Sequence, residues 1–229
     1  MQAIDVMTTD VVSVKPETSV REIAELLLSK RISGVPVVDA EGRVVGVVSE
    51  GDLMRRLEDD DGSDGSWWLA RLASAGGGPE DYVKAHGRHA RDVMTRNVVE
   101  VSKDAPVAEI ARILEQRRIK RVPVTDSGRL VGIVSRANLL HGLAAETPGE
   151  AGSADDREIR ERVESALAEV DGLDAALINV IVSNGVVQLW GLVPSDAQRE
   201  AARVAAENAS GVRSVDNNIG QAPEWIWGV

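Results

Sequence analysis

The sequence predicts an α+β protein: two tandem β-α-β-β-α units packed as a pseudo-two-fold module, followed by a small αββαβ domain. The first observation is an internal repeat, because Asp5–Leu57 and Asp92–Leu143 are two copies of one unit. The second is an amphipathic helical pattern between β-rich runs in both copies. The third is a separate C-terminal segment in which an Asn-Gly pair joins two apolar runs. A unit this short cannot bury its own apolar face, so we expect the two copies to pack together.

Each repeat combines a helical period with β-rich runs. In the first copy Val20, Ile23 and Leu27 share one face of a predicted helix. Ser19 and Glu22 have the spacing of a capping box at the start of that helix. In the second copy Pro106 suits the first helical turn, where its missing N–H costs nothing. The elements expected in the first copy are a strand at 11–14 (98–101 in the second copy), this helix, strands at 35–38 and 44–48, and a helix from near Asp52.

The C-terminal segment has its own start and stop signals. A helix is expected from about Ile159 until Gly172 stops it, and Asn184-Gly185 favours a type I′ turn between two strands. Ser195 begins a second helix with a capping-box spacing, and a final strand is expected at 212–219. The resulting segments are repeat 1 at 1–58, an insert with a Trp pair at 59–88, repeat 2 at 89–145, a linker at 146–154, the C-terminal domain at 155–220, and a tail at 221–229.

Composition excludes several classes of function. The chain has 229 residues and no cysteine, so disulfides, thiolate metal sites and cysteine nucleophiles are excluded. A net charge of −11 argues against a nucleic-acid partner, because binding to phosphates needs a basic surface. The N-terminus lacks a basic stretch followed by an apolar core, and no apolar run is long enough for a membrane span. We therefore expect a cytoplasmic protein.

Several motifs occur in the same order in both repeats. VMT, GVPVVD and GRVVGVVSEGDL in repeat 1 correspond to VMT, RVPVTD and GRLVGIVSRANL in repeat 2. This order resembles a CBS domain (named for cystathionine β-synthase), and two in tandem resemble a Bateman module over nearly all of residues 1–145. The αββαβ order of the C-terminal segment, with NGVVQLWGLV and SGVRSVDNNI, is similar to a BON domain over about residues 155–220.

The CBS resemblance implies a site for an adenosine-containing ligand. Ser49 and Asp52 match the family's Ser/Thr-x-x-Asp motif, whose aspartate holds the ribose hydroxyls. A carboxylate suits this role because it can accept hydrogen bonds from two adjacent hydroxyls. Ser135 and Asn138 depart from the motif, since an amide is an uncharged and weaker acceptor. The alternative is a helix cap, because the same spacing resembles a capping box.

Other positions complete the expected site. Lys120 and Arg121 stand where phosphate-binding modules of the family often carry a basic pair, although a solvated pair at a helix end is the alternative. Gly34 would allow a ligand to approach the backbone closely. The family's adenine contacts come mostly from backbone and apolar groups of the Val-Pro-Val strands. The resemblance thus implies ligand contacts at Thr8, Gly34, Val35, Pro36, Ser49, Asp52, Thr95, Lys120, Arg121, Val122, Pro123, Ser135 and Asn138.

These features favour a regulatory sensor rather than an enzyme. The three histidines lack paired ligand spacing, and we find neither a Gly-rich phosphate loop nor a nucleophile elbow. We expect no required cofactor and no metal site. The expected ligand is AMP, ADP or ATP, bound between the CBS repeats, with S-adenosylmethionine and NADH ranked below. Occupancy would be transmitted to the BON domain or to a partner.

Rival functions stay open at this point. One is a ligand-free dimerisation scaffold, and another is a lipid or envelope adaptor that acts through the BON domain. The acidic composition of residues 155–229 opposes binding to anionic membranes. Trp190 on the predicted hairpin either packs against the module or contacts a partner or headgroup region. We expect a homodimer formed through the CBS repeats.

Overall fold

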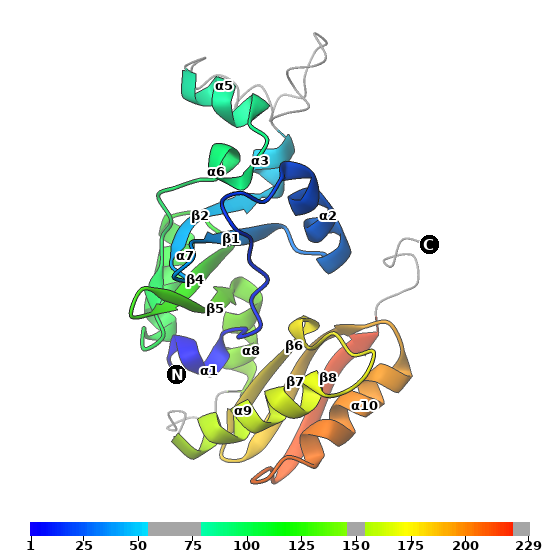
Figure 1. Ribbon diagram of the computed structural model, residues 1–229. Helices are drawn as coiled ribbons and strands as arrows, with labels where there is room; N and C mark the ends of the chain where they lie inside the picture. The colour runs from blue at the N-terminus through cyan, green and yellow to red at the C-terminus, as the bar shows by residue number, and fades with distance from the viewer. Residues whose placement is uncertain (55–78, 146–153, 222–229) are drawn as a thin grey trace. The chain divides into compact units, whose positions relative to one another are not determined.

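The computed structural model describes residues 1–54, 79–145 and 154–221 (Figure 1). The predicted Trp pair of the insert, most of the linker and nearly all of the tail lie outside these residues. The chain forms two compact units that are not contiguous in sequence. Unit 1 contains Met1–Val11, Glu100–Asp126 and the chain from Val131 onward, and unit 2 contains Val12–Val99 and Ser127–Leu130.

Unit 2 is built around repeat 1. Its two strands pair in an antiparallel manner, with Gly34 opposite Ser49, as expected. Ser19 caps the helix that follows it by accepting from the Glu22 N–H, and the Glu22 side chain caps in return, which confirms the predicted capping box. Ile23 and Leu27 enter the core. The elements are α2 (Val20–Lys30), β1 (Gly34–Val38), β2 (Val44–Ser49), α3 (Glu50–Met54), α5 (Pro79–His86) and α6 (Ala90–Val93).

Unit 1 combines the first eleven residues of the chain with most of repeat 2. The three strands of this repeat have the order β3-β4-β5, and β3 is parallel to β4. Pro106 is the N-cap of its helix rather than a residue of the first turn, because its ψ of 138° is extended. The elements are α1 (Ala3–Val6), β3 (Val101–Ser102), α7 (Val107–Gln116), β4 (Arg121–Asp126), β5 (Arg129–Ser135) and α8 (Arg136–Ala145).

The Val-rich strand expected at the start of each repeat is shorter than predicted. At 11–14 only Val14 pairs, through a parallel bridge to Val37. At 98–101 the strand is displaced to Val101–Ser102, which pairs with Val124 and Thr125. In both copies the chain meets the neighbouring strand only at the end of the valine run, so most of the run has no partner for a ladder. The helix after β2 also begins earlier than predicted, at Glu50.

The Val-Met-Thr segment of each repeat packs against the hairpin of the other repeat. Thr8 exchanges backbone hydrogen bonds of 2.9 and 3.0 Å with Ile133 in unit 1, and Thr95 does the same with Val47 in unit 2. A methionine covers a glycine at each junction. A Cβ atom built on Gly132 would lie 2.3 Å from Sδ of Met7, so any larger residue there would force the Met7 side chain to shift. The spatial grouping therefore differs from the order of the repeats along the chain.

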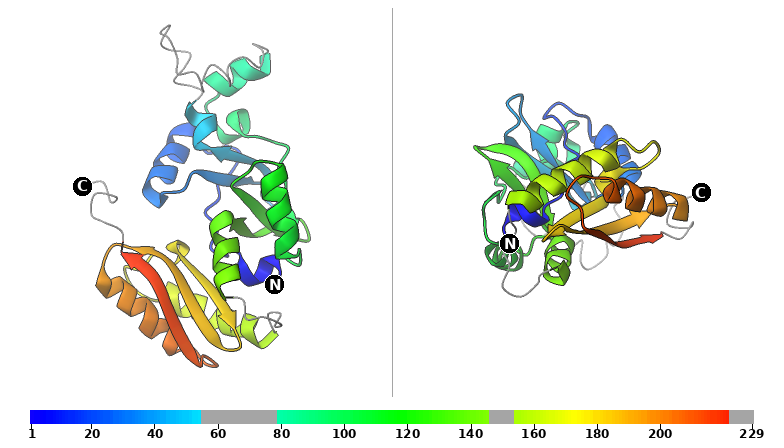
Figure 2. Two further views of the ribbon diagram at one scale, coloured as in Figure 1. Left: turned by 180° about the vertical axis from the view of Figure 1, so that it is seen from behind. Right: turned by 90° about the horizontal axis from the view of Figure 1, so that it is seen from below.

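The C-terminal domain has the predicted αββαβ order. Its strands have the order β6-β7-β8; β6 and β7 are antiparallel, and β7 and β8 are parallel. Asn184 and Gly185 have φ values of 52° and 75°, as the predicted type I′ turn requires. Two helices cover one face of the sheet (Figure 2). The elements are α9 (Ala154–Ala168), the 3-10 turn η2 (Ala175–Leu177), β6 (Ile178–Ser183), β7 (Val186–Val193), α10 (Asp196–Glu207) and β8 (Ser214–Gln221).

The other face of this sheet carries buried groups as well. Ile181 is fully buried, although it alternates with the strand residues that form the domain's own core. α8 of repeat 2 packs on β6. Within the described parts of the chain, no helix has the length and apolar content needed to cross a membrane.

Candidate functional site

The predicted ligand-binding residues fall into two groups, one in each unit. Each group lies where the end of a hairpin meets the start of a helix, beside a Val-Met-Thr segment. Half-site 1, in unit 2, comprises Gly34, Val35, Pro36, Ser49, Asp52 and Thr95. Half-site 2, in unit 1, comprises Thr8, Lys120, Arg121, Val122, Pro123, Ser135 and Asn138.

In half-site 1, Asp52 is held at the start of α3. Its Oδ2 atom accepts hydrogen bonds from the backbone N and from Oγ of Ser49, at 2.9 and 2.6 Å. The helix-cap geometry considered from the sequence is therefore present. The other carboxylate oxygen, Oδ1, accepts no hydrogen bond from the described residues, and the side chain is half-buried. The cap thus orients the carboxylate and leaves one acceptor atom for another group.

In half-site 2, Asn138 is fully engaged. Its Oδ1 accepts from the backbone N and from Oγ of Ser135, at 2.9 and 2.6 Å. Its Nδ2 donates to the carbonyl of Val6 at 3.1 Å and to Oγ1 of Thr8 at 3.3 Å. The residue is 5% exposed. A ligand would have to displace these bonds before it reached the amide.

The remaining predicted residues differ in exposure. Val35, Pro36, Val122 and Pro123 are buried within β1 and β4, whereas Thr95 and Lys120 are exposed. The backbone of β2 lies close to Gly34, where an added Cβ would lie 3.1 Å from the Val48 carbonyl oxygen. The tight approach that requires glycine is thus made by the protein itself. The phosphate role of Lys120 and Arg121 stays a prediction.

A polar cluster around α1 was missed by the sequence reasoning. Arg160 of α9 is 4% exposed and donates to the carbonyls of Ile4 and Met7. Arg157 forms an ion pair with Asp5 at 2.8 Å, and this hydrogen bond raises the pKa of the Arg157 guanidinium. Asn179 of β6 donates to the Val6 carbonyl at 3.2 Å. The duplicated Asp-Val-Met-Thr segment was the sequence signal that could have drawn attention to this region. Its first copy contacts Arg157, Arg160 and Asn179.

An aromatic contact lies beside this cluster. His141 of α8 stacks on Trp190 of β7 with ring centroids 4.8 Å apart, and it lies 3.4 Å from Oδ1 of Asn179. Burial lowers the pKa of His141, and the Asn179 hydrogen bond partly opposes that shift. Trp190 therefore packs against the repeat, which was one of the two alternatives for this side chain.

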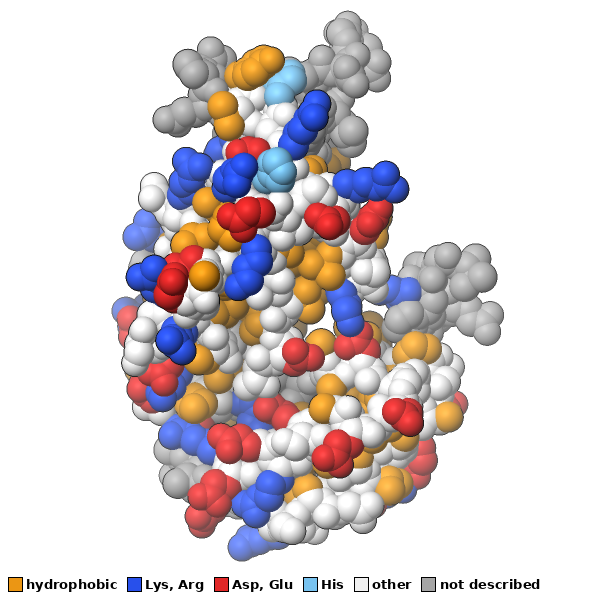
Figure 3. Space-filling model, viewed as in Figure 1, with side chains coloured by type: hydrophobic (Ala, Val, Ile, Leu, Met, Phe, Trp, Pro, Cys, Tyr) orange, Lys and Arg blue, Asp and Glu red, His pale blue; other side chains and the backbone are white. Residues whose placement is uncertain are grey.

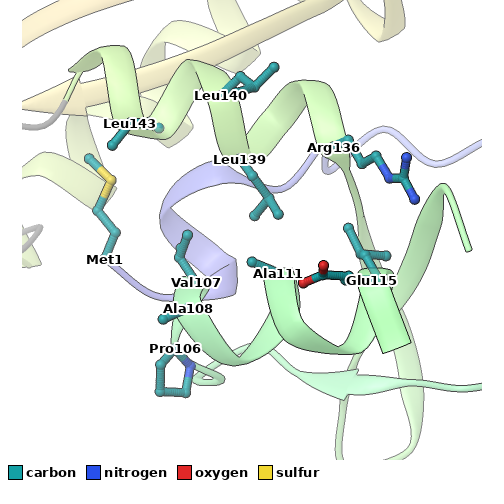
Figure 4. A pocket seen from close by; sticks show the side chains of 12 residues that line it. Met1, Pro106, Val107, Ala108, Ala111, Glu115, Arg136, Leu139, Leu140 and Leu143 are labelled. Atoms are coloured by element: carbon teal, nitrogen blue, oxygen red, sulfur yellow. The ribbon is translucent and has the colours of Figure 1, made fainter. Parts of the chain in front are cut away.

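An apolar groove runs between α7 and α8. It has a volume of about 730 Å³, and Figure 4 shows Leu139 directed from α8 toward Ala111 of α7. Leu140 and Leu143 on the same helix are 64% and 67% exposed. By contrast, acidic side chains are spread over the helical face of the C-terminal domain (Figure 3). Among the described residues, no cluster of His, Asp and Glu is arranged to hold a metal ion.

Comparison with known proteins identifies both parts of the chain. The sequence matches the CBS domain family over residues 3–59 and 90–145 and the BON domain family over residues 155–223. The CBS domain-containing protein CBSX1 of Arabidopsis thaliana is 34% identical over 139 residues, which are 56% of this chain and 56% of that protein. Protein MJ1426 of Methanocaldococcus jannaschii is 30% identical over 151 residues, covering 61% of this chain and 89% of that protein.

A solved structure shows the same fold for the CBS pair. The crystal structure of CBSX2, an Arabidopsis thaliana protein, in complex with AMP superposes with a TM-score of 0.52. Its sequence identity is 31%, and the match covers 62% of this chain and 96% of that chain. The present chain spans about half the length of the curated Arabidopsis relatives that it matches. The chain therefore belongs to the CBS-domain proteins, and it carries two CBS domains followed by a BON domain.

Proposed function

We propose that this protein is a regulatory sensor whose CBS pair binds one adenosine-containing ligand of the AMP, ADP or ATP class at half-site 1. The observation that carries the proposal is the oriented Asp52 carboxylate, whose Oδ1 atom accepts no hydrogen bond from residues 1–54, 79–145 and 154–221. The complex of CBSX2 with AMP supports the ligand class. S-adenosylmethionine and NADH rank below the nucleotides.

The geometry of Asp52 suits the recognition of a ribose. The two bonds from Ser49 fix the side chain before a ligand arrives, so little conformational entropy is lost on binding. The free oxygen can then accept a hydroxyl proton in a charge-assisted hydrogen bond. Lys120 and Arg121 belong to half-site 2, and their positive charges are proposed to attract the phosphates of a nucleotide, because guanidinium and ammonium groups are the usual partners of phosphate oxygens.

Isothermal calorimetry with AMP tests the site. Asp52→Ala should weaken binding roughly ten- to a hundredfold, because a hydrogen bond to a charged group contributes about 1.5–3 kcal/mol. Asn138→Ala should matter less, since Asn138 is occupied by Val6 and Thr8. Equal losses in the two variants, or no binding of adenine nucleotides by the native protein, would refute the assignment.

Two further variants separate the parts of the ligand. Asp52→Asn keeps the size of the side chain and an oxygen for the Ser49 cap while removing the charge, so it is the matched control for Asp52→Ala. Replacing Lys120 and Arg121 together by alanine should weaken binding of ATP more than binding of adenosine, because only the phosphate interaction is lost. Similar losses for both ligands would contradict a phosphate role.

The proposed output is a regulatory interaction and not catalysis. Ligand binding would favour one arrangement of the protein, and the BON domain or a partner would respond to it. A cytoplasmic location stays a prediction. The rival function is a ligand-free dimerisation scaffold. The apolar groove between α7 and α8 supports this rival, because it offers a surface for a second copy of the chain.

We further propose that the groove between α7 and α8 is where a second copy of this chain binds, giving a homodimer through the CBS domains. Its exposed leucines would be costly to leave in water, at about 25 cal/mol per Å² of apolar surface. Sedimentation should show twice the chain mass of 24.5 kDa at micromolar concentration. Replacing Leu140 and Leu143 by glutamate should yield monomers, whereas Arg112→Glu on the exposed part of α7 should not. A monomeric native protein would exclude this dimer.

A further inference from the structure

The first Asp-Val-Met-Thr segment supports the BON domain, with which it shares a compact unit. In the first copy the Asp5 side chain is 6% exposed and paired with Arg157 of the BON domain. In the second copy the Asp92 side chain is 27% exposed, and its partners are the nearby Arg88, His89 and Arg91. Both aspartates cap their own short helix, so docking of the BON domain is an additional role of the first copy.

The BON domain captures the carbonyl groups at the end of α1. Carbonyls at a helix end lack partners within the helix and need other donors. Here Arg160 supplies donors to two of them and Asn179 supplies a third. Glu164 accepts from Nε of Arg160 at 2.9 Å, which balances the buried charge. This is a specific polar interface, and its central cation is almost fully buried.

The same interface closes the surroundings of half-site 2. The Val6 carbonyl receives one hydrogen bond from Asn138 of the half-site and another from Asn179 of the BON domain. Thr8 lines a cavity of only about 100 Å³ together with Glu164 and Asn179. Sites for small molecules usually occupy about 300–1,000 Å³. The cavity that Thr8 shares with the docked BON domain is therefore too small for a nucleoside.

We propose that the docked BON domain keeps half-site 2 closed, and that its release opens this half-site to a second adenosine-containing ligand. The inference rests on the proposed function of the CBS pair and adds the regulation of its second half-site. Undocking frees the space beside Thr8 and removes one of the two donors to Val6. Segment 2–8 can then shift and allow Asn138 to turn toward a ligand. Because linkage is reciprocal, a ligand in half-site 2 disfavours docking by the same factor.

AMP titration of the full chain by calorimetry tests the inference. The native protein should bind one AMP per chain, in a manner that depends on Asp52. Arg157→Ala, which removes the ion pair to Asp5 and the bond to Gln2, should add a second binding event that Asn138→Ala abolishes. Asn179→Ala removes one neutral donor and is the milder second variant if Arg157→Ala folds poorly. Arg162→Ala is the matched control, because Arg162 lies on the same helix and, within the part of the chain that the structure describes, bonds only to Glu158.

Docking itself can be followed without a ligand. The chain has no cysteine, so cysteines introduced at the exposed Arg112 and Asp216 can carry one pair of spin labels in each chain, and mixing with an excess of unlabelled protein leaves one labelled chain per dimer. Arg157→Ala should broaden the distance distribution, and Arg162→Ala should leave it narrow. If a variant with an undocked BON domain still binds a single AMP per chain with the native affinity, this inference is wrong and the proposed function is unaffected. An unchanged distribution in both Arg157→Ala and Asn179→Ala would overturn it too. If neither the native protein nor any variant binds AMP, both this inference and the proposed function are wrong.

Discussion

In half-site 1 the residue three positions after the motif serine is Asp52, whereas in half-site 2 it is Asn138. Both side chains accept the same pair of hydrogen bonds from their serine, with distances that agree within 0.1 Å. The difference lies in the second terminal atom of the side chain. In Asp52 this atom is an oxygen that accepts no hydrogen bond from the described residues, and in Asn138 it is a nitrogen that donates to Val6 and Thr8.

This pair shows how one atom can separate a structural role from a binding role. An amide nitrogen can hold two acceptors of the protein itself, so Asn138 ties α1 to α8. A carboxylate has no proton to donate at neutral pH, so Asp52 cannot make these bonds. Its second oxygen is left for a donor from outside, and ribose hydroxyls are such donors. The departure from the family motif at Asn138 thus coincides with the place where the BON domain docks.

Of the changes considered, Asn138→Asp in half-site 2 should have the largest effect on stability. Asn138→Asp removes both donations and places a carboxylate beside the carbonyl of Val6 in a buried position. Leaving buried polar groups unsatisfied costs about 1–3 kcal/mol, and more when the group is charged. We therefore expect the free energy of unfolding to fall by about 2–4 kcal/mol, measured by urea denaturation.

The reverse change in half-site 1 is the matched control. Asp52→Asn keeps the Ser49 bonds and lies at a half-buried position, so the loss of stability should stay below about 1 kcal/mol. Its effect should appear in AMP binding instead. Similar losses of stability in the two variants would mean that the half-sites are structurally equivalent, contrary to the comparison.

The glycines beneath the two methionines offer a test in which the repeats should behave alike. A Cβ on Gly132 or on Gly46 would lie 2.3 Å from Sδ of the facing methionine, Met7 or Met94. Each methionine has to shift, and crowding of this kind costs about 1–3 kcal/mol. Gly132→Ala and Gly46→Ala should therefore destabilise the protein by comparable amounts in urea unfolding. A loss confined to Gly132→Ala would show that only the segment that supports the BON domain is rigid.

Local patterns in the sequence were sufficient to predict most of the fold. The helical period of Ile23 and Leu27, the capping box at Ser19 and the Asn184-Gly185 turn all depend on neighbours within a few residues. The four-residue helices α1 and α6 were missed because they are shorter than two helical turns, so no period can appear. The length of the first strand was wrong because it depends on a partner strand far along the chain.

The candidate site could be predicted only in part for the same reason. The motif positions at Ser49 and Ser135 could be found from the repeat, and the structure gathers them into two half-sites. The hydrogen bonds that the Asn138 amide donates could not be predicted, because the acceptors in Val6 and Thr8 lie more than a hundred residues away in the sequence. The burial of Arg160 could not be predicted either, because it depends on carbonyls of a distant segment.

The smallest expected effect concerns pH and the aromatic contact between α8 and β7. Burial holds the pKa of His141 below its ordinary value, so the folded protein favours the neutral imidazole. The unfolded chain takes up this proton at an ordinary pKa of about 6.5. Stability from this group is therefore fully present above about pH 6.5 and falls as the pH drops toward the lower folded pKa. The midpoint of urea unfolding should decrease slightly between pH 7.5 and pH 5.5 in the native protein. His141→Gln should reduce that decrease. An identical pH dependence in the native protein and His141→Gln would show that the stack on Trp190 does not sense this proton.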